Sequence, residues 1–195
     1  MYIYILLNIL IMNNAFATPQ LYLTGRIINA VGFDSNELYI KYQIIMGSNF
    51  KKLDGVLQGD TFQSLSLQNE EINVVNFDQP LYFNLSCKSI KGWPKILIEV
   101  WANDQDGRNS LAGYGTAWIP FKPGYTKMSI NCWRPTEEVT TSLGEDLLGN
   151  NAEFIDKSAV YSNIEKFGIN TVSTGQVNIE VEVILKDFIL HGIKV

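Results

Sequence analysis

Residues 95–120 read KILIEVWANDQDGRNSLAGYGTAWIP. The segment starts with an apolar, β-branched run, passes through a polar turn and ends in a second apolar run. Two runs of this kind separated by an Asp-Gly turn are typical of strands joined as a hairpin. All four tryptophans of the chain lie between Trp93 and Trp133. The segment therefore predicts part of the core of a β-rich domain rather than a catalytic site.

Residue patterning with a period of two continues on both sides of this hairpin. Eight strands are expected, at 21–30, 38–45, 61–67, 81–87, 96–101, 113–119, 128–133 and 177–185. The last has the cleanest alternation, with Asn178, Glu180 and Glu182 on one face and aliphatic side chains on the other. Such a strand has one buried and one solvated face. The pattern predicts an all-β fold, an antiparallel β-sandwich of about eight strands, with a short arm or loop at 50–56 and a loop at 68–79.

One segment departs from this strand pattern. Residues 136–149 read TEEVTTSLGEDLLG, with apolar residues spaced by four. Thr136 is suited to cap the start of a helix, and Gly149 to end it. We expect one short helix near 137–148, packed on the sandwich; a partner-binding helix is the alternative.

The N-terminus is strongly apolar. Residues 1–12 are followed by Ala15-Phe16-Ala17, which resembles the core and cleavage site of a signal peptide. No basic residue precedes the run, and it is shorter than the roughly 20 residues that span a bilayer. We therefore expect residues 1–20 to be a leader or extension, signal-like or preceding a true start near Met12, and residues 21–193 to form the domain. The sequon at Asn84 is compatible with secretion but lies within an expected strand.

Composition limits the function classes. A chain of 195 residues with 46% hydrophobic content fits one domain with a packed core. A net charge of −5 argues against a general nucleic-acid binder and disfavours strong attraction to anionic lipid. Cys87 and Cys132 are either two buried thiols, as in a cytosolic protein, or one bridge in a secreted one.

No motif for catalysis is apparent in the sequence. His191 is the only histidine and lies near the C-terminus, where it is expected at the surface. No serine has a nucleophile-elbow context, and Gly113-Tyr114-Gly115 opens a strand rather than a helix, unlike a phosphate-binding loop. Because Cys/His metal spacings are also missing from the sequence, we expect a protein that is not an enzyme, with no catalytic, cofactor-binding or metal-binding residues.

Two carboxylate pairs are candidate sites. Asp104 and Asp106 in the hairpin turn, with Asp34 and Glu37 from a neighbouring loop, would be the oxygen ligands of a calcium site. A simple Asp-Gly turn is the favoured interpretation. The second pair, Glu145 and Asp146, is expected to be solvated.

Other charged and aromatic residues are candidates for contacts. Lys88, Lys91 and Lys95 would touch anionic lipid or an acidic partner, or would be ordinary solvated side chains. A partner-binding surface would expose apolar or aromatic residues. The candidates for such exposure are Phe50, Tyr125 and Phe154.

A series of short motifs resembles a known family. In chain order they are Gly25–Phe33, Gly92-Trp93-Pro94, Val100-Trp101, Asp106-Gly107-Arg108, Leu111–Gly115, Trp133-Arg134-Pro135, Tyr161-Ser162 and the closing strand through Lys186-Asp187-Phe188. Each is weak alone, but their order and spacing resemble the B9-domain proteins of the ciliary transition zone, over about residues 21–193.

The resemblance implies a C2-like β-sandwich without enzymatic activity. It implies a scaffold subunit of the transition-zone complex, in assembly with two related proteins, B9 domain-containing protein 1 and the Meckel syndrome type 1 protein. It places the chain at the cytoplasmic face of the cilium base, where the complex forms a gate and supports cilium assembly. The alternative from another class is a calcium- or phospholipid-binding C2-type module, for which secretion is an option. Peripheral membrane contact is compatible with either.

Overall fold

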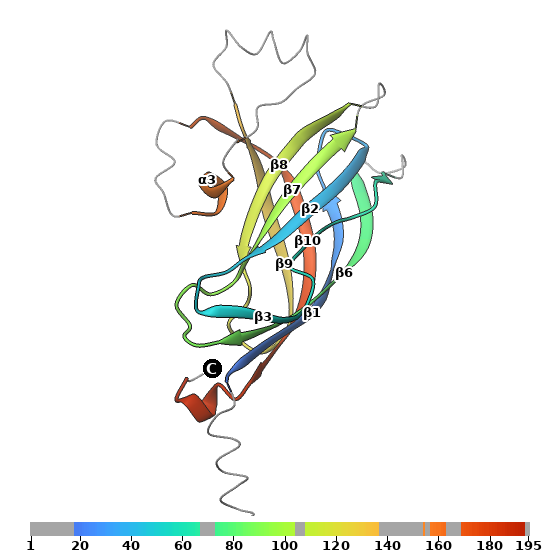
Figure 1. Ribbon diagram of the computed structural model, residues 1–195. Coiled ribbons are helices and arrows are strands. Elements are labelled where there is room, and N and C mark those ends of the chain that lie inside the picture. Colours follow the sequence, from blue (N-terminus) through green and yellow to red (C-terminus); the bar gives the residue numbers. More distant parts are fainter. Residues whose placement is uncertain are drawn as a thin grey trace, which may run out of the picture.

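Ten strands form one antiparallel sheet that curls into two facing layers (Figure 1). The computed structural model describes residues 18–66, 73–103, 108–136, 154, 157–162 and 169–193. The strands are β1 (Gln20–Val31), β2 (Glu37–Ile45), β3 (Phe50–Gly55), β4 (Gln58–Asp60), β5 (Ser64–Leu65), β6 (Val74–Cys87), β7 (Lys95–Asn103), β8 (Asn109–Trp118), β9 (Gly124–Pro135) and β10 (Thr171–Lys186). A helical turn, α3 (Ser158–Tyr161), and a 3₁₀ turn, η1 (Ile189–His191), complete the described elements.

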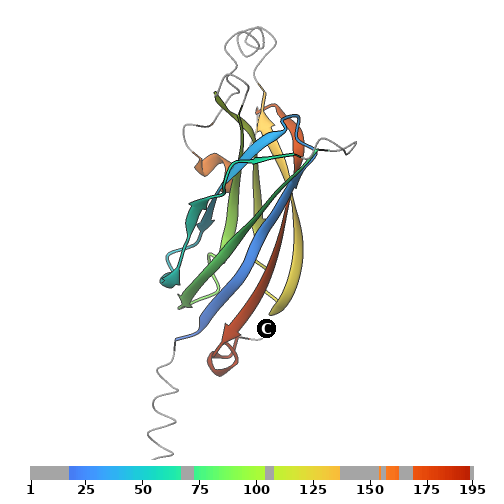
Figure 2. The ribbon, with the colours of Figure 1, turned by 90° about the vertical axis from the view of Figure 1, so that its right-hand side faces the viewer.

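The strand order is β3-β6-β1-β10-β9-β8-β7-β2-β4, with β5 also paired to β2. The first five strands form one layer and the next four form the other, as the turned view in Figure 2 shows. At one margin the chain itself passes from one layer to the other. There, Val56 N donates to Tyr82 O, and Ile44 N donates to Leu57 O. The two layers are therefore joined along both margins.

At the other junction, β8 and β9 pair at Tyr114 and Trp133. Gly115 allows this close approach, because a Cβ atom there would lie 2.8 Å from Ile130 Cγ2 and 2.9 Å from Cys132 Sγ. The Gly-Tyr-Gly motif thus has a packing role at the point where the sheet turns from one layer into the other.

The main core lies between the layers. Val177, Ile179, Val181 and Val183 of β10 are at most 1% exposed, which confirms the alternation read from the sequence. They pack with apolar side chains from both layers in one continuous cluster. The expected all-β architecture is confirmed.

A smaller apolar cluster lies outside the sheet. Leu97, Leu111 and Tyr114 project from the outer face of β7 and β8, and Val160 of α3 covers them. Burial on both faces explains why the start of β7 is an uninterrupted apolar run instead of an alternating one.

Several expectations about individual elements were wrong or fall outside the description. Residues 50–56, expected as a short arm or loop, contain the edge strand β3, and β6 begins at Val74 within the expected loop 68–79. Of the strand expected at 61–67, residues 61–66 are described, and among these only Ser64–Leu65 is strand. The helix expected at 137–148 lies outside the described residues, as does the apolar segment 1–17. Within the described ranges, no helix is long and apolar enough to cross a membrane.

Candidate interaction surface

The outer face of β6, β1, β10 and β9 is the broad open surface of the sandwich. The outer face of β7 and β8 is covered by Phe154 and α3. On the β6-β1-β10-β9 face, by contrast, the outward side chains are polar or partly exposed, and no described helix packs on it.

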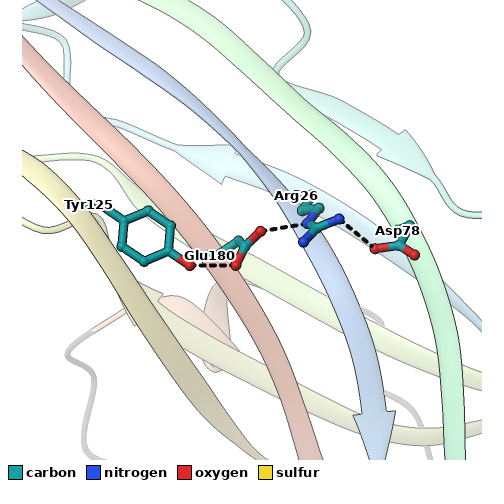
Figure 3. Close-up of polar contacts among 4 residues, drawn as sticks. All are labelled: Arg26, Asp78, Tyr125 and Glu180. Atoms are coloured by element: carbon teal, nitrogen blue, oxygen red, sulfur yellow. Dashed lines mark hydrogen bonds and ion pairs between the residues drawn. The ribbon is translucent and has the colours of Figure 1, made fainter.

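A chain of polar contacts crosses this face from strand to strand (Figure 3). Arg26 Nε donates to Glu180 Oε1 at 2.5 Å, and Arg26 Nη1 lies 3.1 Å from Asp78 Oδ1. The Tyr125 hydroxyl donates to Glu180 Oε2 at 2.5 Å. The register brings these groups together, because Arg26 of β1 pairs directly with Glu180 of β10. We call Arg26, Asp78, Tyr125 and Glu180 the face network.

The hydrogen bonds of the face network shift the pKa values of Glu180, Tyr125 and Arg26. The hydrogen bond from Tyr125, followed by that from Arg26, lowers the pKa of Glu180 below its ordinary value of 4.5. The same bond raises the pKa of Tyr125, and the contact with Glu180 raises the pKa of Arg26. At neutral pH Glu180 is therefore a carboxylate, Arg26 a guanidinium and Tyr125 a neutral phenol.

The network holds Tyr125 in place while leaving this residue 59% exposed. Beside it is a shallow hollow of about 270 Å³, lined by Thr24, Gly25 and Glu182 together with network residues. Tyrosine and arginine are among the residue types most enriched among energetically dominant contacts in protein interfaces. The cluster offers a guanidinium, two carboxyl groups and a phenol, all of which form hydrogen bonds.

A second polar row lies further along the same strands. Asn178 Nδ2 donates to Asn29 Oδ1 at 2.8 Å, and the Ser129 hydroxyl donates to Asn178 Oδ1 at 2.6 Å. Cross-strand contacts of this kind fix the side chains of a sheet face relative to one another. The face is thus an ordered polar surface with an aromatic group standing on it.

The four residues of the calcium hypothesis are divided between described and undescribed parts of the chain. Asp104 and Asp106 lie outside the described residues, as do Glu145 and Asp146. Asp34 is exposed and lines a hollow of about 310 Å³ that Arg134 also lines. Glu37 accepts a hydrogen bond from Gln63 Nε2 at 2.5 Å. No set of three or more metal-ligating side chains gathers in the part of the chain that is described.

The two cysteines are free and buried, which confirms the thiol interpretation. Burial raises the pKa of Cys132 to about 12, and burial also raises the pKa of Cys87. His191 is exposed on η1, as expected. Asn84 is buried in β6 and pairs with β1 and β3, so the folded sandwich has no room for a sugar on its side chain.

The three lysines considered as contact candidates, Lys88, Lys91 and Lys95, lie in two different environments. Lys88 and Lys91 are exposed. The Lys95 ammonium donates to Tyr161 O and lies 4.4 Å from the centroid of a Trp118 ring. Lys95 therefore helps hold α3 on the sheet.

The three candidate contact aromatics also differ. Phe50 is buried and Phe154 is partly buried, which leaves Tyr125 as the exposed member. The sequence pattern predicts Glu180 on a solvated face but does not reveal its partners. Arg26 and Glu180 are 154 positions apart, and only the strand register joins them.

Comparisons with known proteins identify the family. The family described as "Ciliary basal body-associated, B9 protein" matches residues 21–184. "B9 domain-containing protein 2" of Xenopus laevis is 31% identical over 175 residues, which cover 90% of this chain and 98% of that protein. The same-named proteins of Bos taurus and Drosophila melanogaster are 28% and 30% identical with equal coverage.

More distant relatives were also found. The human "Tectonic-like complex member MKS1" is 27% identical over 179 residues, which cover 81% of this chain and 31% of that protein. Among solved structures, a C2 domain of plant Extended Synaptotagmin 1 has a TM-score of 0.44 at 10% identity, covering 83% of this chain and 92% of that one. The family match over most of the chain decides the assignment: this chain belongs to the B9-C2 family of ciliary basal body-associated B9 proteins.

Proposed function

We propose that this chain is a non-enzymatic scaffold subunit of a B9 complex in the ciliary transition zone. The observation that carries the proposal is the family match over residues 21–184. The named relatives support it, since they include B9 domain-containing protein 2 from several animals and a member of a tectonic-like complex. The role would be to hold other subunits in the gate at the cilium base and thereby support cilium assembly.

The partners we propose are two further B9-domain proteins, B9 domain-containing protein 1 and the Meckel syndrome type 1 protein. The complex would lie on the cytoplasmic face of the cilium base. A scaffold needs surfaces that present fixed side chains, because ordering them on binding would cost affinity. The face network meets this requirement, since Arg26 and Tyr125 are already held by Glu180.

We therefore propose the β6-β1-β10-β9 face as a partner-docking surface. Tyr125 would provide apolar contact area around a polar tip, and Arg26 would provide charge and hydrogen bonds. Glu182 lines the same hollow and makes no ion pair in the described part of the chain, so a basic group of a partner would find a carboxylate there.

The test is co-purification of the tagged full chain with the two proposed B9 partners from ciliated cells. Tyr125→Ala is expected to reduce recovery of a partner about tenfold or more, as for a central interface aromatic. Phe62→Ala is the matched control, because Phe62 is 84% exposed but lies outside this face. Recovery of neither B9 partner with the unaltered chain would overturn the scaffold proposal. Equal recovery of the partners with Tyr125→Ala and with Phe62→Ala would mean that the partners dock on another surface.

A further inference from the structure

One end of the sandwich is strongly basic although the chain as a whole is acidic. Strands β1, β7 and β9 begin there, and β2, β6, β8 and β10 end there. We call this the basic end, and it comprises residues 18–19, 46–52, 86–95, 118–124 and 186–193. These segments contain one acidic residue, Asp187, against seven lysines: Lys51, Lys52, Lys88, Lys91, Lys95, Lys122 and Lys186. The full chain carries a net charge of −5.

Among the described residues, no acidic side chain forms an ion pair with the lysines of the basic end. Lys95 contacts Tyr161 O and Trp118. The remaining six lysines are at least partly exposed, and none forms an ion pair with a described residue. Their field is therefore available to an anionic ligand.

Large apolar side chains project from the same end. Ile189 and Leu190 on η1 are 82% and 65% exposed, and Ile90 in the β6–β7 loop is 49% exposed. Figure 1 shows η1 near the lower end of the sandwich. Ile90 and His191 line one hollow of about 440 Å³, which places the two loops side by side.

This apolar tip rests on a rigid base. Phe188, the residue before η1, is buried, and its ring packs against Trp93 at 6.3 Å between centroids. Trp93 also packs against Phe50, and its Nε1 donates to Ile119 O at 2.8 Å. Ile189 and Leu190 are thus presented outward by a fixed aromatic cluster.

We propose that the basic end docks on an anionic lipid bilayer, with Ile189 and Leu190 entering the interface and the lysines contacting lipid phosphates. A bilayer supplies an anionic layer with an apolar layer directly beneath it, which matches lysines surrounding projecting aliphatic groups. A second copy in a symmetric contact would oppose lysines to lysines. The apolar residues 1–17 join the domain at Thr18, at this same end.

This site is separate from the face proposed for partner docking and does not depend on a scaffold role. The acidic remainder of the chain would be repelled by an anionic surface, so the charge asymmetry also orients the molecule. The overall charge of −5 disfavours lipid attraction, but the local charge of the basic end has the opposite sign.

The test is sedimentation of the full chain with phosphatidylcholine vesicles, with and without phosphatidylserine, in the presence of a calcium chelator. Binding is expected for the phosphatidylserine vesicles and is expected to weaken as salt is added. The double variant Lys88→Glu with Lys91→Glu should lower the partition coefficient about tenfold or more. Ile189→Ser with Leu190→Ser should lower the partition coefficient similarly, because it removes the apolar groups that enter the interface. Both positions are exposed, so the fold should be kept.

Two matched variants serve as controls. Lys127→Glu changes a lysine of β9 that lies beyond the basic end, opposite Glu180. Phe62→Ser changes an exposed aromatic outside the basic end. Both variants should bind like the unaltered chain. No binding to anionic vesicles at low salt would overturn the proposal, as would equal losses in the controls. Binding that persists in both double variants but disappears without residues 1–17 would assign it to that segment instead. Self-association that depends on Ile189 and Leu190, without vesicle binding, would make this end a contact between copies.

Discussion

At the scale of single residues, Glu180 is the centre of the open face. It receives a hydrogen bond from Tyr125 and another from Arg26, and these come from the strands on either side of β10. An isolated exposed ion pair contributes little to stability. The contacts of Glu180 instead hold Arg26 and Tyr125 in fixed positions, and arginine and tyrosine are residue types that often dominate interfaces.

The lowered pKa of Glu180 predicts a pH-dependent effect of Glu180→Gln. The contribution of its ionised form should be complete above its ordinary value of 4.5 and should be lost as pH falls through the folded-state pKa. The urea midpoint of the variant should therefore lie below that of the unaltered chain at pH 7, and the gap should close in acid. A gap independent of pH would contradict this. Glu182→Gln, which removes a carboxylate from the same face, should have a smaller effect at pH 7.

Burial also predicts the behaviour of the two thiols. Because the pKa of Cys132 is raised to about 12 and that of Cys87 is also raised, little thiolate forms at neutral pH. Alkylation by iodoacetamide should be slow in the native protein and rapid in guanidinium, as measured by mass spectrometry. Rapid labelling of either cysteine in the native state would show that it is accessible.

At the scale of elements, the segment around α3 acts as a cover for the outer face of β7 and β8. Val160 fills the apolar cluster there, and the Lys157 ammonium pairs with the buried Glu99 carboxylate at 2.7 Å. Trp101 Nε1 also donates to Glu99, at 3.3 Å. A buried carboxylate that loses its cation is costly, so this pair specifies where the cover docks.

Lys157→Ala should therefore loosen the cover. The expected loss in unfolding free energy is about 1–3 kcal/mol, which is below the cost of breaking a fully buried ion pair because the Lys157 side chain is 43% exposed. Hydrogen exchange should rise in residues 157–162 while the core of β10 stays protected. Lys127→Ala, at a position on the other layer, is the control and should change neither quantity. Unchanged exchange in 157–162 would mean that the apolar contacts alone hold the cover.

The junction between β8 and β9 gives a further prediction. Gly115→Val would push side-chain atoms into Ile130 and Cys132, whose nearest atoms lie within 3 Å of the position that a Cβ atom would take. Overpacking of this kind costs about 1–3 kcal/mol, measurable as a lower urea midpoint. Thr116→Val places the same side chain at the adjacent, partly exposed position and should cost less. Equal stabilities of the two variants would contradict a packing role for the glycine.

The long strands were predictable from the sequence, whereas the short edge strands were not. The alternation of β10 identifies it directly, since one of its faces is buried. β3 exposes four consecutive residues, Lys51–Asp54, and so carries no alternating signal. β6 begins with Val74 and Val75, but the polar Asn76, Asp78 and Gln79 that follow hide the strand signal in the sequence. The face network was not predictable, because it depends on a register between strands far apart in the chain.

At the scale of the whole molecule, the sandwich separates two kinds of surface. One broad face carries the ordered Tyr125 and Arg26, while one end carries the lysines and the tip formed by Ile189 and Leu190. Both are supported by the same apolar core between the layers. With the protein-docking face and the membrane-docking end that we propose, the sandwich would be suited to hold a complex against a membrane at the cilium base.

The most direct test of this account is the location of the tagged full chain, expressed at its natural level in its own ciliated cells. Fluorescence should concentrate at the base of each cilium, between the basal body and the axoneme, and should overlap there with the two proposed B9 partners. Signal confined to the cell surface or the medium, with none at the cilium base, would contradict the assignment to a transition-zone complex.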